Sequence, residues 1–283
     1  MSASVFPSTL IGKGPSWQGF GQLKFLVIFG ASYCDVGYNY RFSPVPTDDQ
    51  PLGVEFPGTT FAEPGEANWV GHLITNYASS IPLLVYDYAW GGSRVPDVKT
   101  QIEVIFRQHI GEKPARAPWT ATDTLFITWV GINDSAWSSE NSENLKNLFE
   151  AHETLYNTGA RNFLFANIPP IDRSPGVLSS FPRGTAENYV NWNTELKKAA
   201  ALFATAHHDA TVMIYSSWDT FNTLLDDPKA HGFSAEDVYR AGASIWVDAL
   251  HPTSKVHDFV ARDLSTFLLA QGAWSEIEHN QQI

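Results

Sequence analysis

Residues 24–37, KFLVIFGASYCDVG, decide the fold that this chain is expected to take. Five apolar residues, 25–29, run up to Gly30, and Ser32 follows two positions later. An apolar run that stops at a glycine is typical of a buried strand ending in a tight turn. Because open α/β sheets build their sites where the carboxyl ends of the strands meet, the pattern predicts that Ser32 lies at such an edge.

Four further apolar runs of strand length follow, and stretches with helical spacing separate them. Strands are expected at 83–88, 125–130, 162–166 and 212–215, and helices at 68–77, 98–109, 145–156, 189–203 and 253–270. This alternation predicts an α/β fold with a five-stranded parallel sheet covered by helices on both faces.

The chain is expected to form one domain over residues 1–283, because the sequence contains no repeat and no linker that would divide it. Residues 1–22 are rich in Gly, Pro and Ser and are expected to lie on the surface of that domain. The proline-rich residues 38–65 are expected to form a long loop near Ser32.

Composition excludes several classes of partner. The chain has 18 Lys and Arg against 30 Asp and Glu, a formal net charge of −12. This balance argues against nucleic acid and anionic membranes, which both require clustered basic residues. No apolar run approaches the roughly 20 residues of a membrane span. A small-molecule or oligosaccharide partner is therefore expected. The sequence does not determine the oligomeric state, for which a monomer is expected.

The sequence also bears on the compartment. Cys34 is the only cysteine, which precludes an intrachain disulfide, and a buried thiol is expected there rather than a second nucleophile. The first 20 residues lack the basic flank and apolar segment of a signal peptide, and the only Asn-x-Ser/Thr acceptor is at 133–135. A cytoplasmic protein is expected, with a secreted form that has lost its signal as the alternative.

Polar residues follow the predicted strands at positions that suit acyl transfer. Ser32, Gly92 and Asn133 each follow a strand, while Asp248 and His251 directly precede the last helix. Serine acyl transfer requires a base, a carboxylate that orients the base, and donors for the oxyanion. We expect Ser32 as nucleophile, His251 as base and Asp248 as its partner. The expected oxyanion donors are the backbone N–H groups of Ser32 and Gly92 and the side-chain amide of Asn133.

Four sequence blocks also carry a resemblance. FGASYCDVG, DYAWGGS, VGIND and DALH are similar, in this order, to the GDS-x-x-D-x-G, N-x-A-x-G-G-A, G-x-N-D and D-x-x-H blocks of the SGNH (GDSL) hydrolases. The resemblance implies a three-layer, flavodoxin-like sheet in the order 2-1-3-4-5 and ester hydrolysis without a cofactor. Ala31 and Asp87 depart from the pattern, which usually has Asp and Asn there; altered turn hydrogen bonds are expected.

Within that superfamily the chain looks most like fungal acetylesterases of carbohydrate esterase family 16. The resemblance implies a serine esterase that removes acetyl groups from sugars through an acyl-enzyme intermediate. Two alternatives stay open: a lipase, lysophospholipase or thioesterase acting on longer acyl chains, and a catalytically dead carbohydrate-binding module.

Several other residues near the expected site have simpler interpretations. Trp90 and Trp137 adjoin the oxyanion turns and are candidates for substrate binding, although most of the ten tryptophans must be in the core. Asp35 and Asp134 are expected to be structural turn residues. The sequence His207-His208-Asp209 lacks further metal ligands and is expected to be a solvated helix end, so neither a metal nor another cofactor is predicted.

Overall fold

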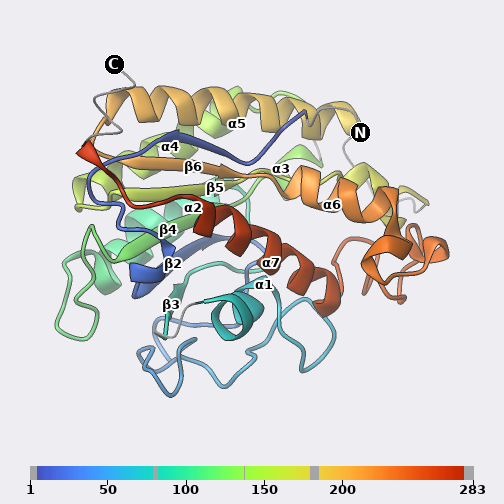
Figure 1. The fold of residues 1–283 in the computed structure, drawn as a ribbon, viewed down its shortest axis with the longest axis horizontal. Helices are drawn as coiled ribbons and strands as arrows, with labels where there is room; N and C mark the ends of the chain where they lie inside the picture. Colours follow the sequence, from blue (N-terminus) through green and yellow to red (C-terminus); the bar gives the residue numbers. More distant parts are fainter. Residues whose placement is uncertain (1–4, 79–81, 137, 179–184, 277–283) are drawn as a thin grey trace.

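The computed structural model describes residues 5–78, 82–136, 138–178 and 185–276. Six strands form one sheet in the order β1-β6-β5-β4-β2-β3 (Figure 1). The strands are β1 (Thr9–Gly12), β2 (Phe25–Gly30), β3 (Leu84–Asp87), β4 (Thr124–Trp129), β5 (Asn162–Ala166) and β6 (Thr211–Tyr215).

The five predicted strands are all present and parallel to one another. Their order, β3-β2-β4-β5-β6, corresponds to the order 2-1-3-4-5 that the resemblance implies. Every residue of β2, β4, β5 and β6 is buried. Continuous apolar runs of this kind are expected of parallel strands, because helices cover both of their faces.

The prediction of a five-stranded, wholly parallel sheet is wrong by one strand. β1 pairs antiparallel with β6, with Thr9 opposite Ile214. Residues 1–22 were expected only to lie on the surface, yet this stretch supplies β1 as well as Trp17, which is fully buried. The four residues of β1 have no strand pattern of their own. They are extended because they pair with the edge of β6.

The helices form two groups. One group consists of α2 (Val95–Thr100), its continuation η3 (Gln101–Gly111), α3 (Ile132–Ser135), α4 (Ser142–Asn157) and α5 (Ala186–Ala206). The other consists of α1 (Trp69–His72), its continuation η2 (Leu73–Tyr77), α6 (Ser217–Asp226) and α7 (Ser254–Ala270). α4 packs between α2 and α5, whereas α7 packs on α1 and α6. In Figure 1, α7 crosses in front of the sheet and α4 lies behind it.

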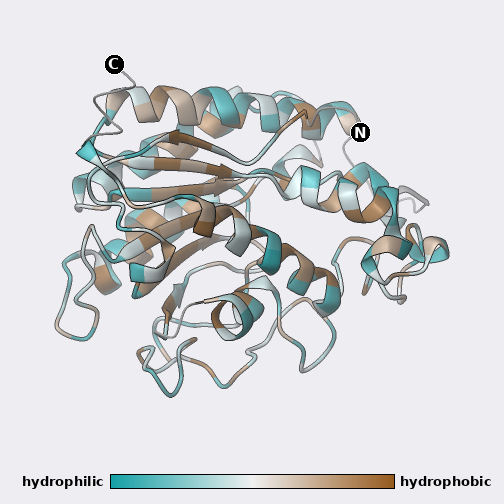
Figure 2. Ribbon diagram, viewed as in Figure 1, coloured by the Kyte–Doolittle hydropathy of each residue, from teal (hydrophilic) through white to brown (hydrophobic). Residues whose placement is uncertain are grey.

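Short single turns connect these elements. They are η1 (Phe20–Gln22), η4 (Ile171–Arg173), η5 (Pro175–Leu178), η6 (Pro228–His231) and η7 (Ala235–Asp237). The segment between β2 and α1 contains no helix or strand, as its prolines predict. Figure 2 shows the hydrophobic colour gathered in the central strands. Within the part of the chain that the structure describes, none of the helices has the length and apolarity required to span a bilayer.

Candidate active site

The residues expected to carry chemistry meet at the carboxyl edge of the parallel strands. Ser32 follows β2 in a tight turn, in which the backbone N–H groups of Cys34 and Asp35 donate to the carbonyl oxygen of Ala31. The turn leaves Ser32 only 7% exposed. Its Oγ lies 2.9 Å from Nε2 of His251, which is 219 residues later in the chain.

His251 is held by a carboxylate from its own turn. Its Nδ1 lies 2.8 Å from Oδ2 of Asp248, while Oδ1 of Asp248 accepts hydrogen bonds at 2.7 Å from the backbone N–H groups of Leu250 and His251. Partial burial opposes ionisation of Asp248, but the hydrogen bonds from the His251 side chain and from the two backbone groups lower its pKa to about 2. The geometry therefore gives a continuous Ser32–His251–Asp248 chain that ends in an ionised carboxylate.

Tyr33 ties this turn to the end of β2. Its hydroxyl donates a 2.7 Å hydrogen bond to the carbonyl oxygen of Leu250, and its ring packs edge-on against His257. Tyr33 is 3% exposed, so packing around its ring fixes the position of the hydroxyl that makes this bond. The sequence analysis missed Tyr33 because an aromatic residue inside an apolar block gives no sign of a specific hydrogen bond.

The three expected oxyanion donors lie in the turns after β2, β3 and β4. Among the described residues, none accepts a hydrogen bond from the backbone N–H of Ser32 or Gly92. The side-chain amide of Asn133 donates one hydrogen bond, of 2.9 Å, to the carbonyl oxygen of Ser93. An amide nitrogen carries two hydrogens, so this bond orients Asn133 and leaves its second N–H for a ligand.

Glycines shape two of these turns. Gly92 has φ +80°, a left-handed conformation that a side chain would strain. Gly131, two residues after the end of β4, has φ +120°, and a Cβ there would lie 2.1 Å from Cε2 of Trp192. The turn that leads from β4 to Asn133 therefore requires glycine at residue 131.

Two polar side chains hold the turns together. The carboxylate of Asp35 accepts hydrogen bonds of 2.8 Å from the N–H of Gly37 and 2.9 Å from that of Gly91, linking the β2 and β3 turns. The amide of Gln101 both donates to and accepts from the backbone of Gly30, each at 2.9 Å, and donates to Oγ of Ser93. Gln101 is fully buried; a polar residue on an apolar helix face was the signal that could have revealed it.

Two buried carboxyl groups support the same edge. Burial raises the pKa of Asp134 to about 6, although its carboxylate accepts a hydrogen bond from the N–H of Val95 at the start of α2. Burial also raises the pKa of Asp87 well above its usual range; one of its oxygens accepts from the N–H of Ala89. Asp87, where the SGNH pattern usually has Asn, therefore acts on the backbone of its own turn.

The remaining candidates near the site lie in different environments. Trp90 is half-buried and lines a pocket of about 390 Å³ together with Asp35, Tyr38 and Tyr88. Trp137 lies outside the described residues. Cys34 is fully buried, and burial raises the pKa of its thiol well above the usual value, which disfavours the reactive thiolate.

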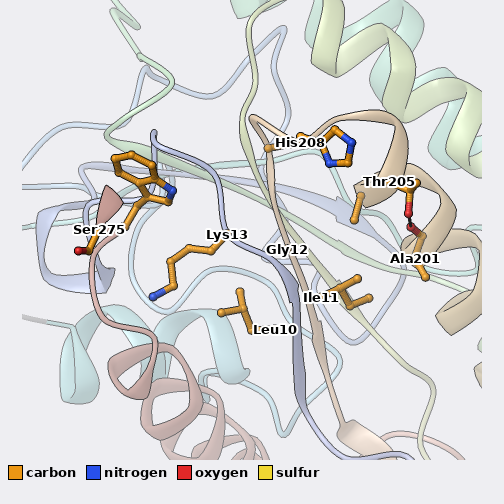
Figure 3. A pocket seen from close by; sticks show the side chains of 11 residues that line it. Leu10, Ile11, Gly12, Lys13, Ala201, Thr205, His208 and Ser275 are labelled. Carbon is orange, nitrogen blue, oxygen red and sulfur yellow. Dashed lines mark hydrogen bonds between the residues drawn. The ribbon is translucent and has the colours of Figure 1, made fainter. Parts of the chain in front are cut away.

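The His207-His208-Asp209 sequence is more than a solvated helix end. Nε2 of His207 lies 2.8 Å from the carboxylate of Glu153, and Asp209 pairs with Arg161 at 2.8 Å. The middle residue, His208, lines a pocket of about 440 Å³ between β1 and α5, which Figure 3 shows with Lys13 on its opposite side. None of the residues lining this pocket belongs to the Ser32–His251–Asp248 chain.

Comparisons with known proteins agree with this architecture. The chain is 31% identical over 264 residues to an acetylesterase of Thermothelomyces thermophilus; the match covers 84% of this chain and 86% of that protein. A variant of an acetyl xylan esterase from Geobacillus stearothermophilus superposes with a TM-score of 0.55 at 14% identity, covering 90% of this chain and 99% of its own. A second structure, of the acetyl xylan esterase AlAXEase, has a TM-score of 0.50 and 11% sequence identity. That match covers 86% of this chain and 98% of AlAXEase. At these identities the two structures show a shared fold.

The family assignment rests on sequence. Residues 26–264, from β2 to the middle of α7, match the family described as GDSL-like lipase/acylhydrolase. The matched range contains every described element that contributes to the Ser32–His251–Asp248 chain. The chain therefore belongs to the GDSL-like lipase/acylhydrolase family and is a carboxylic ester hydrolase.

Proposed function

We propose that this protein is a serine esterase that removes acetyl groups from sugars or oligosaccharides through an acyl-enzyme intermediate. The observation that carries the proposal is the Ser32–His251–Asp248 chain, in which His251 lies 2.9 Å from Ser32 Oγ and 2.8 Å from Asp248 Oδ2. Beside it, the backbone N–H groups of Ser32 and Gly92 donate to no described residue. The acetylesterase to which the chain is 31% identical supports acetate as the acyl group.

In the proposed reaction, Ser32 Oγ attacks the ester carbonyl while His251 Nε2 takes the hydroxyl proton. The oxyanion receives hydrogen bonds from the N–H groups of Ser32 and Gly92 and from the amide of Asn133. As the tetrahedral intermediate collapses, the alcohol leaves with the proton from His251, and the acetyl group stays on Ser32. Water then attacks the acetyl-enzyme by the same steps and releases acetate, so the cycle requires no cofactor.

Asn133→Ala is expected to lower kcat by a factor of about 10² to 10³ with little change in KM, because the amide stabilises the oxyanion more than the ground state. Steady-state kinetics on p-nitrophenyl acetate measure both parameters. Asn144→Ala, the same change on the partly buried start of α4, is the matched control and is expected to leave both within about twofold. A rise in KM at constant kcat would instead make Asn133 a substrate-binding group.

Acyl-chain length tests the proposed function directly. An enzyme with a fatty-acyl channel gains about 0.8 kcal/mol, or roughly fourfold, for each methylene that it buries. We expect kcat/KM to fall from acetyl to butyryl to octanoyl p-nitrophenyl esters, and acetate to be released from acetylated xylo-oligosaccharides. Octanoyl esters as the best substrates would favour a lipolytic enzyme, and absence of turnover on every ester would favour a binding protein.

A further inference from the structure

One exposed aromatic ring contacts the proposed base. Phe61 lies in the long segment between β2 and α1 and is 39% exposed. Its ring centroid is 4.9 Å from that of His251, with 31° between the two planes. Phe61 therefore contacts the imidazole while part of its surface remains open to solvent.

The same ring contacts the turn that contains Gly92. A Cβ added to Gly91 would lie 2.3 Å from Cζ of Phe61, and the N–H of Gly91 is bonded to Asp35. Gly91 does not have a positive φ, unlike Gly92, so its backbone conformation would accept a side chain. A side chain at residue 91 would therefore require the Phe61 ring to shift.

The segment that carries Phe61 is anchored on both sides of the site. Two residues earlier, the N–H of Thr59 donates to the carbonyl oxygen of Val36, in the block that follows Ser32. Two residues later, the carboxylate of Glu63 accepts a 2.7 Å hydrogen bond from the N–H of Ser254, at the start of α7. These anchors hold the ring between the nucleophile turn and the base turn, although the segment has no regular secondary structure.

We propose that Phe61 determines specificity for the alcohol half of the ester by packing its exposed face against the apolar face of a sugar ring. In the proposed reaction the leaving oxygen takes its proton from Nε2 of His251, so the alcohol must lie beside that imidazole. Phe61 lies against the same imidazole and offers an aromatic surface there. Apolar C–H faces pack well on aromatic rings. The inference rests on the proposed function for the position of the alcohol.

The test uses acetate esters that share one acyl group and differ in the alcohol: ethyl acetate, cyclohexyl acetate and a monoacetylated methyl β-xyloside. All three pass through the same acetyl-enzyme, so differences in kcat/KM report the step that includes the alcohol. Phe61→Ala is expected to lower kcat/KM about tenfold for the cyclohexyl and xyloside esters, and less than about threefold for ethyl acetate. Phe61→Tyr, which keeps the ring, is expected to stay within about threefold of the parent for all three.

Phe42→Ala is the matched control, because Phe42 lies in the same segment, is 84% exposed and has no ring contact with His251. It is expected to leave all three rates unchanged.

Gly91→Ala offers an independent probe, since the new methyl group displaces the Phe61 ring. It should lower the xyloside rate in the parent and have little further effect when combined with Phe61→Ala.

Two outcomes would overturn the proposal. An equal fall for all three esters in Phe61→Ala would show that the ring only positions His251, and unchanged rates on the two ring-bearing alcohols would place the alcohol elsewhere. Failure of the proposed function is recognised separately. If the parent enzyme does not hydrolyse the xyloside acetate, or prefers octanoyl esters, the sugar assignment is wrong. The comparison of ethyl with cyclohexyl acetate still tests the role of Phe61 in that case.

Discussion

Ser32→Ala is expected to lower kcat by a factor on the order of 10⁶, because the variant has no group that can form the acyl-enzyme. The only side-chain partner of the hydroxyl in the described structure is Nε2 of His251, at 2.9 Å. Loss of that single bond costs about 1 kcal/mol, so the thermal midpoint should move by only a few degrees. Single-turnover and steady-state hydrolysis of p-nitrophenyl acetate, with thermal unfolding alongside, provide the measurement.

Cys34→Ala separates the two possible nucleophiles of this turn. Cys34 is fully buried and its thiol pKa is raised by burial, so it is not expected to attack esters. The variant should lose some stability, because a buried sulfur is replaced by a void, while kcat stays within a few-fold of the parent. If Ser32→Ala kept more than about a hundredth of the parent rate, or if Cys34→Ala lost as much as Ser32→Ala is expected to lose, the proposed role of Ser32 would be wrong.

Asp248→Asn is expected to lower kcat by roughly 10⁴, the second largest effect. The asparagine keeps an oxygen for the N–H groups of Leu250 and His251, so the turn should keep its shape. Its amide nitrogen, however, would face Nδ1 of His251 and favour the tautomer with the proton on Nε2. In that tautomer Nε2 donates to Ser32 and cannot accept its proton.

The pH dependence of this variant follows from the carboxylate. The pKa of Asp248 is lowered to about 2, so the group stays ionised at every pH above about 4. Protonation of Asp248 should therefore contribute no change in the parent kcat between about pH 6 and 9. Asp258→Asn, in the first turns of α7, is the matched control, because Asp258 bonds Tyr77 and does not touch the site. A fall in kcat of less than about tenfold in Asp248→Asn at about pH 8 would contradict an ionised partner for His251.

The sequence predicted the parallel sheet because its signal is local and repeated. Each of β2 to β6 is an apolar run, and helical spacing separates the runs. The prediction failed where structure depends on a partner far away in the chain. β1 is extended because it pairs with the edge of β6, where Thr9 lies opposite Ile214. α6 was not among the predicted helices. Its buried residues Phe221, Leu224 and Leu225 do have helical spacing, but the signal covers fewer than three turns, residues 217–226.

The candidate site was predictable where several of its residues are close together in the sequence. Asp248 and His251 are three residues apart and form their contact within one turn. By contrast, Phe61 reaches His251 across a segment without regular structure, and the bond from Tyr33 to Leu250 spans 217 residues. No spacing rule relates such residues, so their contacts appear only once the chain is folded. The catalytic and binding roles assigned to all of them remain predictions.

The antiparallel strand at the far edge of the sheet has a consequence for solubility. β6 has five buried residues, and β1 occupies the hydrogen-bonding edge that would otherwise be open. A chain shortened beyond Gly12 would expose that edge as a row of free N–H and C=O groups on an apolar strand. Such an edge is a template for strands of other molecules. The cost of losing β1 would therefore be aggregation between molecules, while the Ser32–His251–Asp248 chain, at the end of a different strand, could stay intact.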